Sequence, residues 1–164
     1  RDLLENFGGH TYAAGLSLKK ENMEAFIERF RYLAAEEINP EQMTPQLDVD
    51  AVLDLKDITP KFVNELKKMN PFGPDNPKPV FCRIGVKDYG TSKLVGKESE
   101  HIKLELIDDN SKMPVHGIAF GMGQFNDHVK ALNPFNICYT VEENTHNGNT
   151  TLQLLIKDIK SGNT

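Results

Sequence analysis

The pattern of apolar and polar positions predicts a helix near the start of the chain and a shorter helix further along. In the first, from Glu21 to about Glu37, apolar residues recur at the three- and four-residue spacing of one helix face. They are Met23, Phe26, Ile27, Phe30, Leu33 and Ala34. We expect this stripe to pack as core. The second helix is predicted to follow Thr59 as its N-cap, with Pro60 at its first position.

Between and before these helices the pattern predicts shorter elements. An apolar run favours a strand over 14–18, and alternating apolar and acidic residues favour a half-buried strand over 47–53. A short helix is expected over 3–7, ending at the glycine pair that follows. Prolines at 40 and 45 indicate a boundary between these parts of the chain.

From Pro79 onward the pattern is rich in strands. The expected strands are 80–87, 101–107, 113–120, 136–143 and 150–158, with a short helix at 124–132. A bent continuation of the first strand as far as 95 is left open. Asn147-Gly148 is the best hairpin turn signal, in a loop expected to exceed two residues. Three strands, a helix and two strands is the order of an OB-fold barrel, a fold that binds oligonucleotides on the face of its second and third strands.

Composition limits the class of protein. With 164 residues, 38% hydrophobic and 26% charged, the chain can bury one core, or one core and a small second unit. No apolar run approaches the roughly 18 residues that span a bilayer, and no export leader opens the chain, so we expect a cytoplasmic monomer with no membrane partner. Cys82 and Cys138 lack any CxxC partner and are expected to be reduced thiols. Arg1 to Glu5 has the character of a helix tail, which favours a fragment of a longer protein.

The charge distribution is more informative than the total. A net charge of −5 argues against a protein that coats nucleic acid by bulk electrostatics. Residues 79–105 carry five basic and four acidic side chains, and this is the one segment with a positive balance. Any contact with a nucleic-acid strand is therefore expected there.

The candidate chemistry begins at Gly8-Gly9-His10. Two adjacent glycines let a backbone approach a bulky anion, and their amides could form an anion-binding nest with the imidazole as a further donor. The alternative is a glycine pair that ends a helix beside a surface histidine. Spacing alone favours this alternative.

The surrounding residues change that balance. Phe7-Gly8-Gly9-His10, followed by Ala13-Ala14-Gly15-Leu16, resembles the DHH-associated domain of DHH-family phosphoesterases. Pro71-Phe72-Gly73, Gly117-Ile118-Ala119-Phe120-Gly121 and Leu152 to Ile159 resemble the OB domain that follows it in RecJ exonucleases. The resemblance implies an α+β fold: a helix-strand-helix remnant of the DHH-associated domain, then a five-stranded OB-fold barrel. The implied domains are the remnant at 1–40, a connector at 41–78 and the OB domain at 79–164.

The resemblance also implies a function. RecJ exonucleases digest single-stranded DNA from 5′ ends in repair and recombination, with Mn²⁺ or Mg²⁺ held by an amino-terminal DHH domain. This chain has no Asp-His-His sequence, and its five histidines are scattered. The metal ligands are therefore expected outside this chain, and the chain alone is predicted to be inactive. Gly8, Gly9 and His10 are expected to position a substrate phosphate.

A DNA-binding surface is expected on the barrel. It comprises Arg83, Lys87, Tyr89, Lys93, Lys97, His101, Lys103 and Phe120. Basic groups would follow phosphates, and an aromatic ring would stack on a base. The alternative is a solvated face of mixed charge, because acidic residues lie among the lysines. Two other functions stay open: a module that docks a protein such as single-stranded DNA-binding protein, and a phosphoesterase acting on short RNA or a cyclic dinucleotide.

Overall fold

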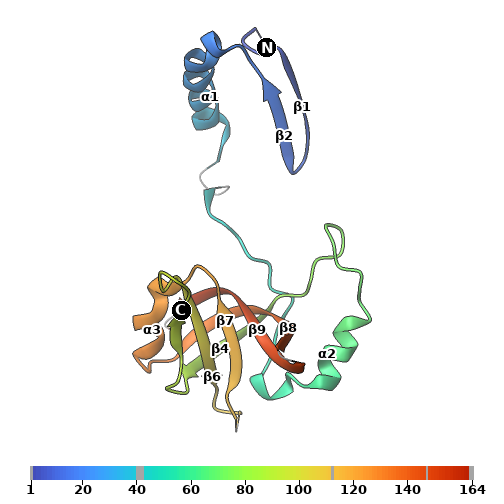
Figure 1. Cartoon of the computed structure of the whole chain (residues 1–164), viewed down its shortest axis with the longest axis vertical. Coiled ribbons are helices and arrows are strands. Elements are labelled where there is room, and N and C mark those ends of the chain that lie inside the picture. Colours follow the sequence, from blue (N-terminus) through green and yellow to red (C-terminus); the bar gives the residue numbers. More distant parts are fainter. Residues whose placement is uncertain (1, 40–42, 112, 147, 163–164) are drawn as a thin grey trace. The chain divides into compact units, whose positions relative to one another are not determined.

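The computed structural model describes residues 2–39, 43–111, 113–146 and 148–162. Its chain forms two compact units, Arg1–Leu47 and Asp48–Thr164 (Figure 1). Each unit is described by itself below. Pro40 of the predicted boundary and Asn147 of the predicted hairpin turn lie outside the described residues.

The first unit begins with a β-hairpin, so the helix predicted over 3–7 is wrong. Strand β1 (Asn6–His10) pairs antiparallel with β2 (Ala13–Ser17), and His10 lies opposite Ala13. A five-residue segment is too short to stabilise a helix by itself. Pairing with β2 satisfies its backbone groups instead. The strand predicted over 14–18 is confirmed by β2.

The predicted long helix is confirmed as α1 (Met23–Glu37), preceded by the short 3-10 turn η1 (Lys20–Asn22). Its apolar stripe is not a closed core. Phe30 is 60% exposed although it stacks on Phe26 with ring centroids 5.8 Å apart. None of the described residues of this unit is buried. The hairpin and helix therefore lack an apolar core of their own within the described chain.

The second unit begins with a segment that packs on the barrel. The strand predicted over 47–53 shortens to β3 (Ala51–Val52), which pairs parallel with the first barrel strand. The 3-10 turn η3 (Leu55–Asp57) and the helix α2 (Pro60–Lys67) follow. The Thr59 cap is confirmed, because its hydroxyl accepts a hydrogen bond from the Phe62 amide at 3.2 Å. Three residues of this segment join the barrel core: Leu55, Ile58 and Val63.

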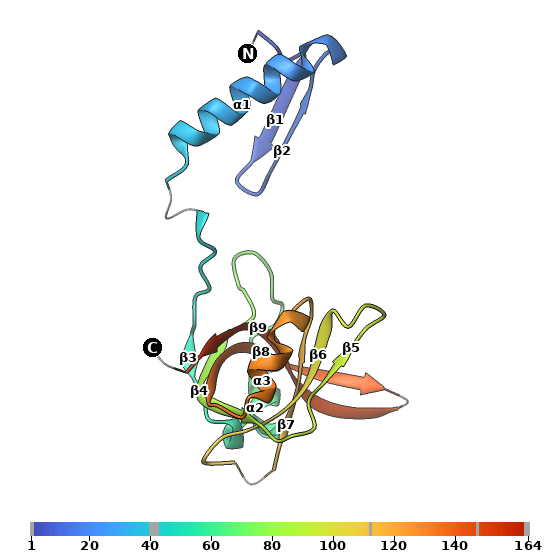
Figure 2. The same cartoon turned by 90° about the vertical axis from the view of Figure 1, so that its left-hand side faces the viewer.

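The barrel strands are β4 (Phe81–Asp88), β5 (Lys93–Val95), β6 (His101–Ile107), β7 (Val115–Ala119), β8 (Phe135–His146) and β9 (Asn149–Ser161). In the described chain, β4, β8, β9, β7 and β6 pair in that order, and β6 pairs back with β4. The pairing is antiparallel except between β7 and β9. This circuit closes five strands into the barrel of an OB fold (Figure 2).

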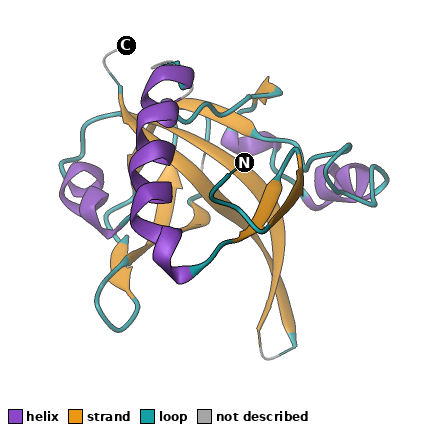
Figure 3. Cartoon of the chain, turned by 90° about the horizontal axis from the view of Figure 1, so that it is seen from above, coloured by secondary structure: helices purple, strands orange, loops and turns teal. Residues whose placement is uncertain are grey.

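Several predicted bounds change. The strand predicted over 80–87 is confirmed by β4, but it does not continue to Val95: β5 is a separate strand, with Gly90 at φ +106° between the two. The strand predicted over 113–120 shortens to β7, and the helix predicted over 124–132 becomes η4 (Gly123–Phe125) and α3 (Asn126–Lys130). Strands β8 and β9 are longer than expected and form a projecting ribbon (Figure 3). His146 pairs with Asn149, so their connection is two residues, not longer.

Alternation along the strands builds the core. Ile102, Leu104 and Leu106 of β6 are fully buried, while the residues between them face outward. Val129 of α3 and Phe135 of β8 are also fully buried. In the described chain no helix is both long and apolar enough to cross a membrane.

We predict that the first unit opens far more readily than the barrel in the isolated 164-residue chain. Its helix α1 has 15 residues and none of them is buried, and a helix of that length is marginal without packing. Native-state hydrogen exchange should give opening free energies of roughly 0–2 kcal/mol for α1 amides, with β6 and β8 amides exchanging at the global limit. Equal protection of α1 and β6 would contradict the prediction.

Candidate nucleic-acid interface

The outer face of β5, β6 and β7 brings two lysines together. Lys93 lies directly opposite Lys103, and Lys103 lies opposite Ile118. Both lysines are exposed. Within the described chain neither has a carboxylate partner within 4.0 Å. Like charges opposite one another destabilise a strand pair. The pair is therefore suited to an anion that would lie between the two ammonium groups.

An aromatic ring lies on the same face. Phe120, just beyond β7, is 58% exposed, and its ring meets the imidazole of His101 edge to face at 5.0 Å. The imidazole is held by its Nδ1, which accepts a hydrogen bond from the Gly121 amide at 3.0 Å. Its Nε2 lies 3.5 Å from a carboxylate oxygen of Glu100. The face thus combines an exposed stacking surface with a positioned imidazole, and Glu100 opposes anion binding at that end.

A hollow of about 210 Å³ adjoins Lys103. A separate hollow of about 370 Å³ lies beside α2 and does not include the lysine pair. The smaller hollow is lined by Lys103, His116, Gly117, Asn144, Thr151 and Gln153. It lies between the β6–β7 face and the base of the β8–β9 ribbon, where OB folds commonly hold oligonucleotides. His116, Asn144 and Gln153 were missed from the sequence. The hairpin signal at Asn147-Gly148 could have indicated them, because it marks the loop between the last two strands.

The other predicted surface residues lie apart from this pair. Lys87 of β4 lies opposite Ile107, and Tyr89 is 56% exposed while its amide donates to the Glu105 carbonyl at 2.8 Å. Lys97 is exposed in the loop after β5. The structure therefore groups the lysine pair with His101 and Phe120, and leaves these three side chains at the margin of the face.

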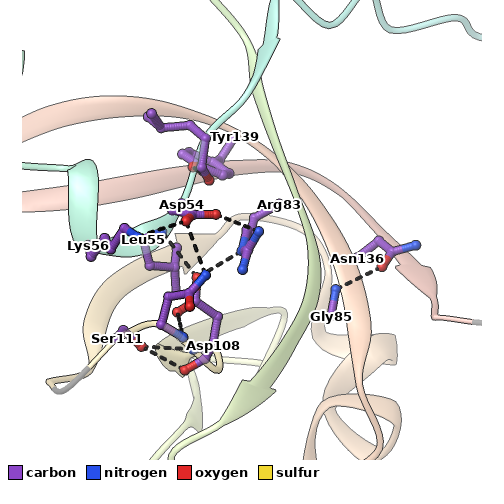
Figure 4. A network of polar contacts seen from close by, with 11 residues as sticks. Asp54, Leu55, Lys56, Arg83, Gly85, Asp108, Ser111, Asn136 and Tyr139 are labelled. Atoms are coloured by element: carbon purple, nitrogen blue, oxygen red, sulfur yellow. Dashed lines mark hydrogen bonds and ion pairs between the residues drawn. The ribbon is translucent and has the colours of Figure 1, made fainter.

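Arg83 serves a different purpose, because its guanidinium lies between two carboxylates (Figure 4). Its Nη1 is 2.7 Å from Asp54 Oδ1, and its Nε donates to Asp108 Oδ2 at 2.8 Å. The Arg83 side chain is 16% exposed and that of Asp108 is 1% exposed. A guanidinium held this way is not available to DNA phosphates, so Arg83 does not belong to the candidate surface.

A turn at Asp108-Asp109-Asn110, directly after β6, carries this network. Asp108 Oδ1 accepts from the Asn110 amide at 3.0 Å, and Oδ2 accepts from the Leu55 amide at 3.2 Å. Burial works to raise the pKa of Asp108, but these amides, Arg83 and the Ser111 hydroxyl together hold it below its ordinary value. Asp108 thus stays ionised and fastens η3 to the barrel.

Gly8 and Gly9 lie in β1, and their surroundings differ. Gly8 lies opposite Gly15 in the hairpin. A Cβ added to either glycine would meet no heavy atom within 4 Å, and both glycines line a hollow of about 320 Å³. A Cβ on Gly9 would lie 2.8 Å from the Ala14 side chain, so only glycine fits there. Successive amides of a strand point to opposite sides. The two amides therefore do not converge on one anion as the predicted nest requires. Gly8 and Gly15 instead form a flat strip of backbone without side chains.

His10 ends β1 beside the turn. Its Nδ1 accepts a hydrogen bond from the Tyr12 amide at 3.2 Å, and its ring meets that of Tyr12 edge to face at 6.3 Å. In the neutral imidazole an accepting Nδ1 places the proton on Nε2. His10 therefore presents an exposed Nε2–H donor next to the hairpin.

The donor groups present do not fit a catalytic metal. Among the described residues, no three His, Cys, Asp or Glu side chains are arranged to hold a metal ion. Nδ1 of His10 and Nδ1 of His101 accept backbone hydrogen bonds, and the Asp108 carboxylate is engaged by Arg83.

Comparison with family models shows which protein family this chain belongs to. A family model described as the RecJ OB domain matches residues 49–158. This chain belongs to that family. The match includes β3, α2 and nearly all of the barrel, so the segment that packs on the barrel is part of the family's domain. The family resemblance stated from the sequence is confirmed.

Sequence similarity to individual proteins covers almost the whole chain. The single-stranded-DNA-specific exonuclease RecJ of Bacillus subtilis is 30% identical over 159 residues, covering 96% of this chain and 20% of the relative. RecJ of Salmonella typhimurium is 29% identical over 158 residues, covering 96% and 27%. The chain thus spans about a fifth to a quarter of the length of the curated relatives that it matches.

A solved structure supports the fold. The crystal structure of RecJ in complex with Mg²⁺ from Thermus thermophilus superposes with a TM-score of 0.73 at 23% identity, covering 98% of this chain and 23% of that one. A second structure of that protein is in complex with Mn²⁺. The mixed helix and sheet fold with an OB-like sheet, predicted from the sequence, is confirmed by this likeness.

We predict that Asp108→Asn destabilises the barrel by roughly 2–3 kcal/mol, because it leaves Arg83 only partly paired in a buried site. The matched control is Asp109→Asn, since Asp109 is the exposed neighbour in the same turn. Urea unfolding monitored by circular dichroism measures both. An effect of Asp108→Asn no larger than that of the control would show that the network contributes little.

The same carboxylate predicts a pH dependence. A folded-state pKa below the ordinary 3.8 means that the stabilisation is complete above that value and is lost as pH falls through the folded pKa. The wild type should therefore lose stability below about pH 4, while Asp108→Asn should lose less over the same range. If the unfolding free energy of the two proteins falls equally with pH, Asp108 is not the group responsible for the loss.

Proposed function

We propose that this chain is part of an exonuclease that digests single-stranded DNA from 5′ ends in repair and recombination. Membership of the RecJ OB domain family and relatives named single-stranded-DNA-specific exonucleases support the proposal. Residues 1–40 would be the end of a DHH-associated domain and 79–164 the barrel of the OB domain, and the part of the 41–78 connector from residue 49 onward would belong to the OB domain. The intact protein would act in the cytoplasm as a monomer.

The observation that carries the proposal is the Lys93–Lys103 pair. Opposed lysines weaken the pairing of β5 with β6 unless an anion lies between them. A DNA strand supplies phosphates for these basic groups and bases for the exposed ring of Phe120. The amide and hydroxyl groups of Asn144, Thr151 and Gln153 add uncharged partners in the adjoining hollow.

The N-terminal hairpin would position a phosphate near the reaction. The side-chain-free strip at Gly8 and Gly15 permits close approach of a sugar-phosphate backbone. The Nε2–H of His10 would donate to a phosphate oxygen, since Nδ1 is already engaged. Mn²⁺ or Mg²⁺ would be held by residues outside this chain and would activate water for hydrolysis in the intact enzyme.

A rival function is a protein-docking module, for instance for single-stranded DNA-binding protein. The hollow of about 370 Å³ has an apolar floor that includes Val63, Leu66 and Val141. Its rim carries Lys67 and Lys78, but Glu143 and Glu142 pair with them at 2.7 Å. No described carboxylate pairs with Lys93 or Lys103 in this way, so the DNA surface is better supported.

We predict that reversing Lys93 and Lys103 to Glu together weakens binding to oligo-dT several-fold at low salt. The slope of log affinity against log salt should become shallower by about 1.4, because each lost phosphate contact removes about 0.7. Fluorescence anisotropy over a salt series measures both quantities.

The control reverses Lys130 and Lys157, two exposed lysines on α3 and β9 that give the same change in net charge. This control should leave the slope nearly unchanged. Equal losses from both double variants would indicate diffuse attraction. No binding by the wild type at low salt would favour the docking module.

We predict that His10→Ala in the intact enzyme lowers kcat/KM on single-stranded DNA roughly 10- to 100-fold, the worth of a charge-assisted hydrogen bond to phosphate. Release of a 5′ label at saturating manganese measures the effect. Thr11→Ala, in the exposed turn beside it, is the matched control. The 164-residue chain alone should release no label, and label release by it that EDTA abolishes would contradict the placement of the metal site.

A further inference from the structure

The chain has two cysteines, Cys82 and Cys138, and the fold places them directly opposite each other on β4 and β8. Both are free and half-buried. Asp158 of β9 lies opposite Cys138 in turn, so the three side chains form a row across three strands. This row lies outside the DNA surface and outside the Arg83 network, and nothing in the proposed function uses it.

The strand register brings the two sulfurs into range of each other. The carbonyl of Cys82 accepts a hydrogen bond from the Leu53 amide at 3.0 Å, so the backbone groups of Cys82 point to β3 rather than β8. Cys82 and Cys138 are therefore a non-hydrogen-bonded pair, in which side chains lie closer and Cα atoms are about 4.5 Å apart. Disulfides need Cα atoms about 4.4–6.8 Å apart. The spacing expected for Cys82 and Cys138 lies within this range, near its lower limit.

We propose that Cys82 and Cys138 are a reversible modification site, a cross-strand dithiol that peroxides oxidise to a disulfide within the chain. The oxidation needs no large backbone movement, because the register already matches the bond. The product would fasten β4 to β8 next to Arg83 and Tyr139. These two residues hold the segment before α2, Arg83 through Asp54 and Tyr139 through its hydroxyl, which donates to the Leu53 carbonyl at 3.2 Å.

The chemistry balances with hydrogen peroxide as the oxidant. One sulfur gives an electron pair to a peroxide oxygen, the O–O bond breaks, and a sulfenic acid and one water form. The second sulfur then attacks the sulfenic sulfur, the S–O bond breaks, and the hydroxyl leaves as a second water with the remaining thiol proton. Two thiols and one peroxide thus give one disulfide and two waters.

The surroundings of Cys138 disfavour its thiolate form. Burial, the neighbouring Cys82 sulfur and Asp158 raise the pKa of Cys138 to about 11, while Lys160 of β9 acts in the opposite direction. Cys138 therefore keeps its proton, and a hydrogen bond between the two sulfurs contributes to this. Since the thiolate is the nucleophile, a protonated Cys138 favours slow oxidation at neutral pH and faster oxidation as the pH rises.

The test oxidises the native chain with hydrogen peroxide and measures thiols and intact mass. Both thiols should be lost together, the mass should fall by two hydrogen atoms, and the product should stay monomeric and revert with dithiothreitol. Its midpoint of urea unfolding should rise, because the bond closes the long loop from 82 to 138. Cys82→Ser and Cys138→Ser give the matched controls, in which the remaining thiol can only gain oxygen or cross-link two chains.

Two results would overturn the proposal. One is oxidation of the folded wild type that adds oxygen to one cysteine or links two chains, as in the serine variants. The other is a native protein that keeps both thiols while the same chain oxidises in urea. Circular dichroism of each serine variant before oxidation shows whether its fold is intact, and a chain that fails this check is replaced by the alanine variant at the same position.

Discussion

The barrel depends on a buried acid and the base that neutralises it. Asp108 sits at the end of β6 with almost no exposure, a position in which an unpaired carboxylate would be strongly unfavourable. Arg83 offers a rigid planar fork whose Nη1 and Nε reach Asp54 and Asp108 at once. The pair thereby joins β4, the turn after β6 and the segment before α2. It lies beside the β4–β6 pairing that closes the circuit of strands.

This interaction divides the basic residues of one segment between two purposes. Arg83 is engaged in structure, whereas Lys93 and Lys103 remain exposed on the outer face. A lysine is a compact, strongly hydrated charge on a flexible stem, so it suits contact with a mobile phosphate backbone better than a fixed buried pair. The residue types therefore match their positions: arginine where geometry is fixed, lysine where a ligand would arrive.

Local patterns predicted most elements, and tertiary pairing decided the rest. The alternation from His101 to Ile107 fixes both bounds of β6, and Thr59-Pro60 fixes the start of α2. No such pattern reveals that 6–10 pairs with 13–17, because glycine-rich segments carry little periodicity. The sequence did not show that Arg83 forms a buried ion pair rather than a surface charge, because its partners Asp54 and Asp108 are 29 and 25 residues away in sequence. The partners of a charged side chain depend on register, which the sequence pattern of one strand does not specify.

Three of the four acidic residues in 79–105 are oriented by hydrogen bonds from within that segment. Asp88 is buried against Ser92, and a carboxylate oxygen of Glu105 accepts from the Thr91 hydroxyl. Glu100 accepts from the Glu98 amide, and backbone amides hold its pKa below the ordinary value. Each of these three carboxylates thus has a donor within the same segment. These hydrogen bonds leave the carboxylates charged, so Glu100 and Glu105 still act on the face. The lysines opposite one another on β5 and β6 have no carboxylate partner in the described chain, which leaves their ammonium groups available to a ligand.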